Sequence, residues 1–314
     1  MTPTLVLHFG ALGDFVISWP ALGRLAAAAE PGGPSRPGGP SRPGGPSRPG
    51  GPSRPAGLHL IGRPEWGRLV LPPERVHDRE SARFSPLFRP DPHPVLDAWL
   101  AGFGRAAVFA HRPDPVLLAR LGAVVPQVWT VPTRPAPGLA LHAGLVQEQA
   151  LADLGLPPAP ALGLLLPRPP APGSPVIAPG SGGPAKRLPP ELVAGLALRL
   201  AAESGPPLVV LGPAEDPDYR AGLASALAAS GAVHSVLADP PLAELAAALR
   251  AAPLYIGADS GVSHLAAAAG ARCLVGFAAS DPAIWAPRGA RARACSFGEL
   301  AGVAAGAGWP DTKP

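Results

Sequence analysis

The sequence contains little charge, few cysteines and few aromatic residues. Only 15% of its 314 residues are charged whereas 47% are hydrophobic, which excludes a chain that stays unfolded throughout. The two cysteines, Cys273 and Cys295, are too few for a disulfide framework or a cysteine-based metal knuckle. Because free thiols fit a reducing compartment, we expect a folded cytoplasmic protein.

A long apolar run is also missing. No stretch of about 18 uninterrupted apolar residues could span a bilayer, and no basic segment followed by an apolar one opens the chain. We therefore expect contact with membranes to be limited to peripheral contact at the inner face of the plasma membrane.

Glycine and proline, by contrast, are abundant, with 39 and 47 copies. The segment 31–54 repeats the hexapeptide PGGPSR four times and carries four arginines but no acidic residue. Outside it the chain has 22 basic and 22 acidic residues, so the net charge of +4 belongs to the repeat. We interpret the repeat as a disordered, Pro-stiffened surface loop, with weak attraction to anionic lipid or phosphate as the alternative. It offers no aromatic residue for base stacking, so we expect no nucleic-acid partner.

Strand and helix patterns alternate along much of the chain. Near the start, apolar runs at 4–9, 58–62 and 106–110 predict strands, and 16–29 predicts a helix. Farther on, strands are expected at 176–178, 208–211, 233–237, 254–256 and 272–277, separated by helices at 191–203, 218–229, 242–251 and 263–269. Such alternation predicts an α/β fold with parallel sheets covered on both faces.

The composition divides this α/β chain into two parts. We expect an N-terminal Rossmann-like domain over 1–165, in which the repeat at 31–54 is an insert. A Pro-rich linker over 166–175 then leads to a second Rossmann-like domain over 176–314. Because ligands bind at the carboxyl ends of parallel strands, two such domains in tandem predict a cleft between them.

Three polar or glycine-rich loops follow expected strands of the second part. In 179–187, bare backbone amides accompany Ser181 and Lys186, a combination that suits a phosphate, although a solvated loop lysine is the alternative. Glu215 can accept hydrogen bonds from a ribose or cap the next helix. Asp259 can accept from sugar hydroxyls or cap the helix that contains His264, itself more typical of a packed helix residue than of an acid or base.

Asp14 lies in a fourth loop, which follows the first expected strand. It can cap a helix that begins near Phe15. Alternatively, its carboxylate can act as a general base toward an attacking hydroxyl in the cleft.

Four motifs occur together and in order: GALGD at 10–14 with PAL at 20–22, PGS at 179–181 with AKR at 185–187, GPAE at 212–215, and DSGVSHLAAA at 259–268. In this combination the chain resembles glycosyltransferase family nine, which contains the ADP-heptose lipopolysaccharide heptosyltransferases. The resemblance implies the GT-B arrangement, in which two Rossmann-like parallel-sheet domains face a cleft. It also implies inverting, metal-independent transfer of a sugar from a nucleotide donor.

The resemblance further implies roles for individual residues. Asp14 would activate the acceptor hydroxyl on the N-terminal, acceptor side, and Lys186 would hold the diphosphate. No metal or other cofactor is expected, so the charge of the leaving group would be stabilised by Lys186 and by helix N-termini. Contacts with the donor would come from Gly13, Ser181, Gly182, Glu215, Asp259, Ser260, Gly261 and His264.

The sequence thus predicts an enzyme that transfers a sugar, by resemblance a heptose, from an ADP-sugar to a glycan or lipid-linked acceptor of the cell envelope, as in lipopolysaccharide biosynthesis. The alternative is a non-catalytic scaffold of the same fold that binds a nucleotide sugar. The presence of both Asp14 and Lys186 favours the enzyme.

Overall fold

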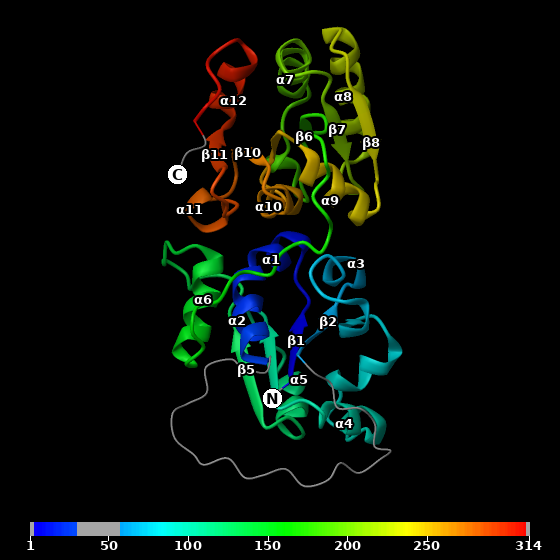
Figure 1. Cartoon of the computed structure of the whole chain (residues 1–314), viewed down its shortest axis with the longest axis vertical. Helices are drawn as coiled ribbons and strands as arrows, with labels where there is room; N and C mark the ends of the chain where they lie inside the picture. The colour runs from blue at the N-terminus through cyan, green and yellow to red at the C-terminus, as the bar shows by residue number, and fades with distance from the viewer. Residues whose placement is uncertain (1–2, 30–56, 312–314) are drawn as a thin grey trace.

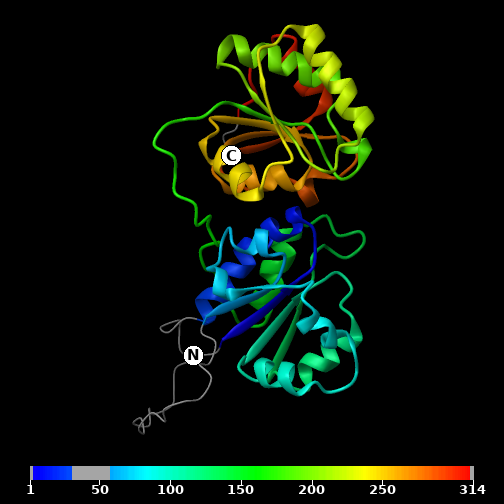
Figure 2. The ribbon, with the colours of Figure 1, turned by 90° about the vertical axis from the view of Figure 1, so that its right-hand side faces the viewer.

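The computed structural model describes residues 3–29 and 57–311, which form two α/β domains, one above the other in Figure 1. The predicted loop at 31–54 lies outside the described residues. Each domain has a parallel β-sheet with helices on both of its faces, as the second view shows (Figure 2).

The N-terminal sheet has five strands in the order β3-β2-β1-β4-β5. The central strand β1 (Thr4–His8) is buried along its whole length, because helices cover both faces of the sheet. Its neighbours are β2 (Leu58–Gly62) and β4 (Arg105–Phe109), and the outer strands are β3 (Val76–Asp78) and β5 (Gln127–Val131).

The helix expected over 16–29 is two helices, α1 (Leu12–Ile17) and α2 (Trp19–Ala29), which meet at Ser18. Farther along, prolines begin helices instead of breaking them, because a helix tolerates Pro in its first turn. Pro64, Pro94 and Pro115 each open a helix in this way. The remaining helices of this domain are α3 (Pro64–Gly67), α4 (Pro94–Leu100), α5 (Pro115–Gly122), α6 (Ala143–Asp153) and two short 3-10 helices at Pro73–Arg75 and Ala82–Phe88.

The C-terminal sheet has six strands in the order β11-β10-β9-β6-β7-β8. They are β6 (Val176–Ala178), β7 (Leu208–Leu211), β8 (Ser235–Ala238), β9 (Leu254–Ala258), β10 (Arg272–Phe277) and β11 (Ala292–Ser296). The helices are α7 (Pro190–Glu203), α8 (Pro217–Ser230), α9 (Leu242–Ala251), α10 (Gly261–Ala268), α11 (Pro282–Trp285) and α12 (Phe297–Ala304), with a 3-10 turn at Pro184–Lys186.

The strand order brings the predicted site loops together. In the C-terminal sheet the chain leaves β6 toward β7 on one side and returns as β9 on the other, so the loops that follow β6 and β9 diverge from neighbouring strands. The register pairs Ala178 with Gly257, so the two loops begin at the same level of the sheet. In the N-terminal sheet β1 lies at the corresponding position between β2 and β4.

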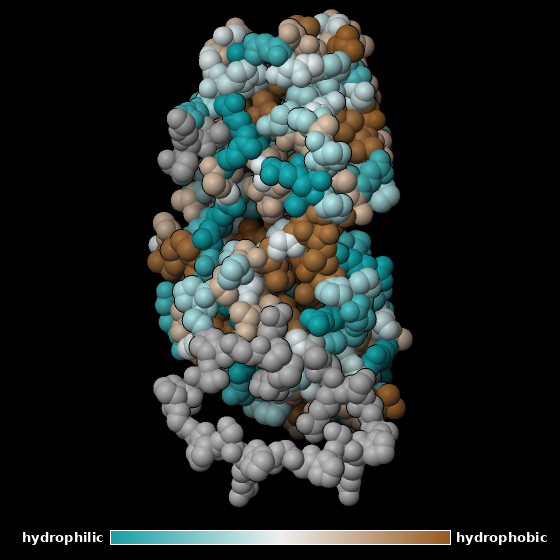
Figure 3. Space-filling model, viewed as in Figure 1, coloured by the Kyte–Doolittle hydropathy of each residue, from teal (hydrophilic) through white to brown (hydrophobic). Residues whose placement is uncertain are grey.

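The two domains meet through α1 and α10, which lie against each other at the centre of Figure 1. One hydrophobic cluster continues across this contact, from Phe15 and Trp19 to Leu265 and Ala266. Apolar residues also gather on the surface at the level where the domains meet (Figure 3). The contact therefore fixes which edges of the two sheets face each other.

Glycine at position 257 is required by the packing of β9, the strand that leads directly into Asp259. A Cβ atom there would overlap the hydroxyl of the fully buried Tyr255 and lie 2.8 Å from the carbonyl oxygen of Ala178. We expect Gly257→Ala to lower the free energy of unfolding by about 1–3 kcal/mol, the usual effect of overpacking a core. Denaturant titration measures this difference.

Gly302→Ala, in helix α12, is the matched control. The nearest atom to its added Cβ would be the Cβ of Ala307, 3.8 Å away. Alanine there should leave stability unchanged or raise it by about 0.5–1 kcal/mol through helix propensity. Equal changes in the free energy of unfolding for the two substitutions would show that overpacking at Gly257 does not cause the destabilisation.

Candidate active site

Nine of the ten predicted site residues line one pocket of about 330 Å³ between the domains. Asp14 reaches it from the N-terminal domain, and Lys186 and Asp259 reach it from the C-terminal domain. The pocket therefore combines groups of both domains at the carboxyl ends of their sheets, where ligands of such folds bind. The nine are Gly13, Asp14, Ser181, Gly182, Lys186, Asp259, Ser260, Gly261 and His264.

Lys186 and Asp259 form an ion pair in this pocket, with Nζ 2.7 Å from Oδ2. Asp259 is only 6% exposed, and Ser280 also donates a hydrogen bond to its carboxylate. Asp259 does not cap α10, because the N-cap is Ser260 and no side chain bonds to the free amides of that helix. A buried carboxylate is thus neutralised by Lys186, and the N-terminus of α10 remains open to a ligand.

The loop after β6 is fastened by two further contacts. The Ser181 hydroxyl donates to the carbonyl oxygen of Asp259 at 2.8 Å, which joins this loop to the loop after β9. Arg187 donates to the carbonyl oxygen of Ala214 at 2.6 Å and pairs with Asp216, which joins it to the loop after β7. The neighbouring Lys186 and Arg187 therefore differ in role: the first faces the pocket and the second holds the loops in place.

Glu215 is the tenth predicted residue, and it lines a second pocket of about 550 Å³. Its carboxylate turns back to accept the backbone N–H of Gly212, whereas Asp216 caps α8 by accepting from the N–H of Tyr219 at 2.9 Å. Burial raises the pKa of the Glu215 carboxyl above its ordinary value. A Cβ at Gly180 would overlap Oε1 of Glu215, so any side chain at this position would displace the Glu215 carboxylate.

The two pockets form one continuous cleft. The larger pocket extends from the loops after β6 and β9 toward Glu215. Its apolar surface comes from Trp66, Leu242 and Val262. Such a shape suits an elongated ligand with an apolar, planar end and a charged middle. The residues that line both pockets are Ala11, Gly13, Ser181, Gly182, Ser260 and Gly261.

Asp14 lies in the first turn of α1 and not before it. The helix begins at Leu12, and Asp14 accepts the N–H of the N-cap residue Ala11 through Oδ2 at 3.1 Å. The expectation that Asp14 is the N-cap of a helix beginning near Phe15 is therefore wrong, because the helix begins at Leu12 and its N-cap is Ala11. The other carboxylate oxygen makes no hydrogen bond to a described residue, and the side chain lines the pocket.

Behind Asp14, a hydrogen-bonded chain fixes its backbone. The Ser18 hydroxyl donates to the carbonyl oxygen of Asp14 at 2.7 Å and lies 3.2 Å from Nε2 of His8. Because the Ser18 hydroxyl donates its proton to the carbonyl oxygen of Asp14, Nε2 of His8 donates to the Ser18 oxygen. His8 is fully buried against Phe15 and Phe109, and this burial lowers its pKa from 6.5 to about 4.

Two glycines allow the domains to touch at the pocket. A Cβ on Gly261 would lie 2.9 Å from the backbone nitrogen of Gly13, and a Cβ on Gly13 would lie 3.3 Å from the ring of His264. The backbones of the N-terminal turns of α1 and α10 consequently approach each other closely at these two glycines. Both helix N-termini border the same pocket.

Three residues that the sequence did not single out also belong to the cleft. Trp285 in α11 forms one wall of the smaller pocket, Trp66 lines the larger one, and Ser280 bonds to Asp259. Their signal in the sequence is weak, because each lies in a segment whose strand or helix pattern is interrupted by proline. Only the fold brings them to the predicted loops.

Among the described residues no three His, Cys, Asp or Glu side chains lie close enough together to hold a metal ion. The triplet Asp216-Pro217-Asp218 has the spacing of an Asp-x-Asp metal motif. However, Asp216 is occupied by Arg187 and by the N–H of Tyr219, so it serves helix α8. Within residues 3–29 and 57–311, none of the helices has the length and apolar character that a membrane span needs.

The family model described as Glycosyltransferase family 9 (heptosyltransferase) matches residues 140–303, more than half of the chain. The chain belongs to this family. It is accordingly a glycosyltransferase, and its two facing Rossmann-like domains are the GT-B fold. No curated protein sequence matches the chain.

Solved structures of the same fold are similar over almost the whole chain. E. coli ADP-heptose LPS heptosyltransferase II has 19% identity and a TM-score of 0.64, covering 94% of this chain and 90% of that one. E. coli heptosyltransferase WaaC, solved with ADP, has 17% identity and a TM-score of 0.62, with 94% and 93% covered. The iron-containing dodecameric glycosyltransferase TibC of E. coli H10407 has 15% identity and a TM-score of 0.51, with 90% and 59% covered. At these identities the likeness shows the fold alone.

His264 gives the family 9 cleft a pH dependence. It is 6% exposed, and burial lowers its pKa from 6.5 to about 4. As the pH falls below 6.5, His264 becomes protonated in the unfolded chain but stays neutral in the folded protein. The free energy of unfolding therefore falls until about pH 4. At about pH 5 this loss amounts to about 2 kcal/mol for this residue.

We expect His264→Gln to weaken the acid dependence of stability by that amount, measured by denaturant titration over a pH series. His111→Gln, at an exposed histidine, controls for the loss of an imidazole. An unchanged pH profile in His264→Gln would contradict the assignment.

Proposed function

We propose that the chain transfers a heptose from ADP-heptose to a hydroxyl of a cell-envelope glycan or lipid-linked acceptor, with inversion at the anomeric carbon and without a metal ion. The observation that carries the proposal is the arrangement of charge in the smaller pocket. A carboxylate of one domain, Asp14, faces the same space as the cation Lys186 and the N-terminus of α10 from the other.

The larger pocket supports a nucleoside diphosphate as the donor. Glu215 lies at its far end, where Oε1 can accept from the ribose hydroxyls, and Trp66 and Leu242 offer apolar surface to a base. The diphosphate then lies over Gly182 and Ser260, residues common to both pockets. The choice of adenine and heptose rests on family membership and on the WaaC and heptosyltransferase II neighbours.

In the proposed reaction Asp14 takes the proton of the acceptor hydroxyl while that oxygen bonds to the anomeric carbon. The bond from the anomeric carbon to the diphosphate breaks, and its electron pair leaves with ADP. Lys186 and the amides at the N-terminus of α10 stabilise this developing negative charge. Because the acceptor attacks from the side opposite ADP, the configuration inverts.

Asp259 has a positioning part in the proposal. Its carboxylate holds Lys186 at 2.7 Å, and it also borders the space that the proposal gives to the diphosphate. When a donor binds, Lys186 can share its donors between Asp259 and phosphate, and Asp259 can accept from sugar hydroxyls. Gly13, Gly261 and His264 shape the wall around the sugar.

The mutation Asp14→Asn tests the base. Asn keeps an oxygen that can accept the N–H of Ala11 but cannot take a proton, so helix α1 should persist. We expect turnover to fall by about 10²–10⁴-fold while affinity for ADP stays unchanged. Release of ADP from ADP-heptose in the presence of envelope extract measures turnover, and calorimetry measures affinity.

Asp114→Asn, at the exposed N-cap of α5, is the matched control and should retain full turnover. ADP binding by the wild type with no Asp14-dependent turnover on any extract would instead favour the scaffold alternative. Absence of ADP binding as well would contradict the donor assignment.

A second prediction concerns the charge on the diphosphate. Lys186→Met should weaken ADP binding by about 10–100-fold, since a hydrogen bond to a charged group contributes about 1.5–3 kcal/mol. Lys186→Arg retains the charge and should recover part of this loss. Calorimetric titration with ADP, GDP and UDP compares both variants with the wild type, and the wild type should prefer ADP.

The ADP-release assay also tests whether turnover is independent of metal ions. Chelator treatment should leave turnover by the wild type unchanged, because Lys186 and backbone amides supply the positive charge. Loss of turnover on chelation that a divalent metal or iron restores would overturn this part of the proposal.

A further inference from the structure

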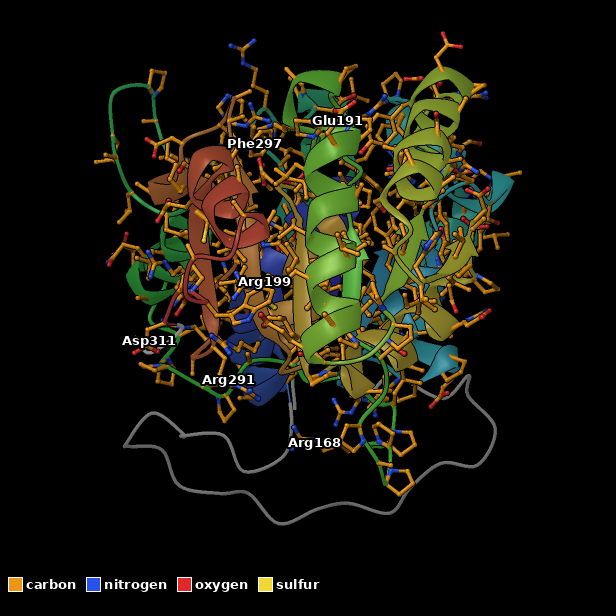
Figure 4. All side chains as sticks on the ribbon, turned by 90° about the horizontal axis from the view of Figure 1, so that it is seen from above. Arg168, Glu191, Arg199, Arg291, Phe297 and Asp311 are labelled. Atoms are coloured by element: carbon orange, nitrogen blue, oxygen red, sulfur yellow. The ribbon has the colours of Figure 1, made fainter. Side chains whose placement is uncertain are left out.

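A pocket of about 390 Å³ lies away from the cleft, where the chain between the domains crosses the C-terminal domain. Three arginines from separate segments line it: Arg168 of the linker, Arg250 near the end of α9, and Arg291 just before β11. Arg168 and Arg291 lie on the same side of this domain in Figure 4. The described residues that line the pocket include no carboxylate.

None of the three guanidinium groups forms an ion pair or a hydrogen bond with a described residue, and the buried Nε of Arg250 has no partner. Other arginines of the same domain are paired: Arg220 binds Asp239, and Arg293 binds Glu299. Three unpaired like charges around one hollow repel each other, and a bound anion would remove that repulsion.

The backbone favours a preformed site. Arg168 stands between Pro167 and Pro169, so its main chain is confined to extended conformations. The linker is fixed beside the pocket, because Gly173 donates its N–H to the carbonyl oxygen of Ala251 at 2.9 Å. Binding at this position therefore requires little additional ordering.

The pocket lies at the end of the sheet opposite the proposed donor site. It borders the start of β9, whereas Asp259 follows the end of the same strand. Five residues of strand separate the two, roughly 15 Å. A ligand here is consequently distinct from the nucleotide sugar.

We propose that Arg168, Arg250 and Arg291 form a second anion site, which binds a phosphate group. Guanidinium forks match the tetrahedral oxygens of phosphate in a bidentate manner, and the absence of a lining carboxylate excludes a cation. The phosphate can belong to a phospholipid headgroup or to a free phosphate. This proposal is independent of the proposed transfer reaction.

The test uses the full chain with ADP present in excess, so that phosphate cannot be counted at the cleft. Inorganic phosphate is titrated by calorimetry, and vesicles of phosphatidylcholine with or without phosphatidylglycerol are tested by co-sedimentation. The variant Arg168→Gln/Arg291→Gln should bind phosphate at least about tenfold more weakly, the loss expected from two charge-assisted contacts. Both residues are exposed, so folding should be preserved, and the melting temperature checks this.

Arg68→Gln/Arg89→Gln is the matched control, because it removes the same charge from two exposed arginines of the other domain. The repeat at 31–54, with its four arginines, is present in every variant. Loss of phosphate binding in the site variant alone supports the site, and accompanying loss of binding to phosphatidylglycerol vesicles identifies a headgroup. Unchanged vesicle binding identifies free phosphate. Equal losses in both variants, or no binding to either probe by the wild type, would overturn the proposal.

Discussion

The close packing of α1 on α10 is the contact on which the site depends. It depends on glycine at Gly261, because a Cβ there would lie 2.9 Å from the backbone nitrogen of Gly13, and it leaves only tight room for a Cβ at Gly13 beside the ring of His264. Because the backbones approach closely there, two helix N-termini from different domains border one pocket. The electrostatic field in that pocket is therefore a product of backbone geometry as much as of charged side chains.

The charged side chains complete this field in a balanced way. The partly exposed Lys186 neutralises the buried Asp259, which avoids the cost of an unpaired buried charge. Glu215 is held by the N–H of Gly212, and Arg187 donates to the carbonyl oxygen of Ala214, which joins the loop of Ser181 to the loop of Glu215. The groups proposed to meet a donor are thus already in place before one binds, and less ordering is left for the binding step.

Much of the C-terminal domain could be predicted from the sequence, because its apolar runs are short, separated by alanine-rich helices and only lightly interrupted by proline. The unpredicted elements include β11, where arginines at 291 and 293 interrupt the apolar pattern, and α12, although Ser296 and Glu299 form the capping box of α12. The helices in the middle of the N-terminal domain were not predicted. Prolines open these short helices, and the sequence pattern alone does not distinguish a proline that opens a helix from a proline in a loop.

The site loops were predictable as loops, but their internal contacts were not. Sequence leaves open whether Glu215 or Asp216 caps α8, since both carboxylates precede the helix; the backbone gives the cap to Asp216. The position of Asp14 in the first turn follows from a helix start at Leu12, which no side chain announces because the N-cap is Ala11. Contacts across the cleft, such as those of Trp285, depend on how two separate domains meet.

The linker limits how far those domains can separate. Leu162 and Leu165 donate hydrogen bonds to the carbonyl oxygens of Trp19 and Leu69, and Gly173 donates one to Ala251. Only the seven residues between Leu165 and Gly173 are left unattached by backbone hydrogen bonds, and four of the seven are proline. A tether this short and stiff permits swivelling but little drift. The half that carries Asp14 is therefore kept facing the same surface of its partner domain.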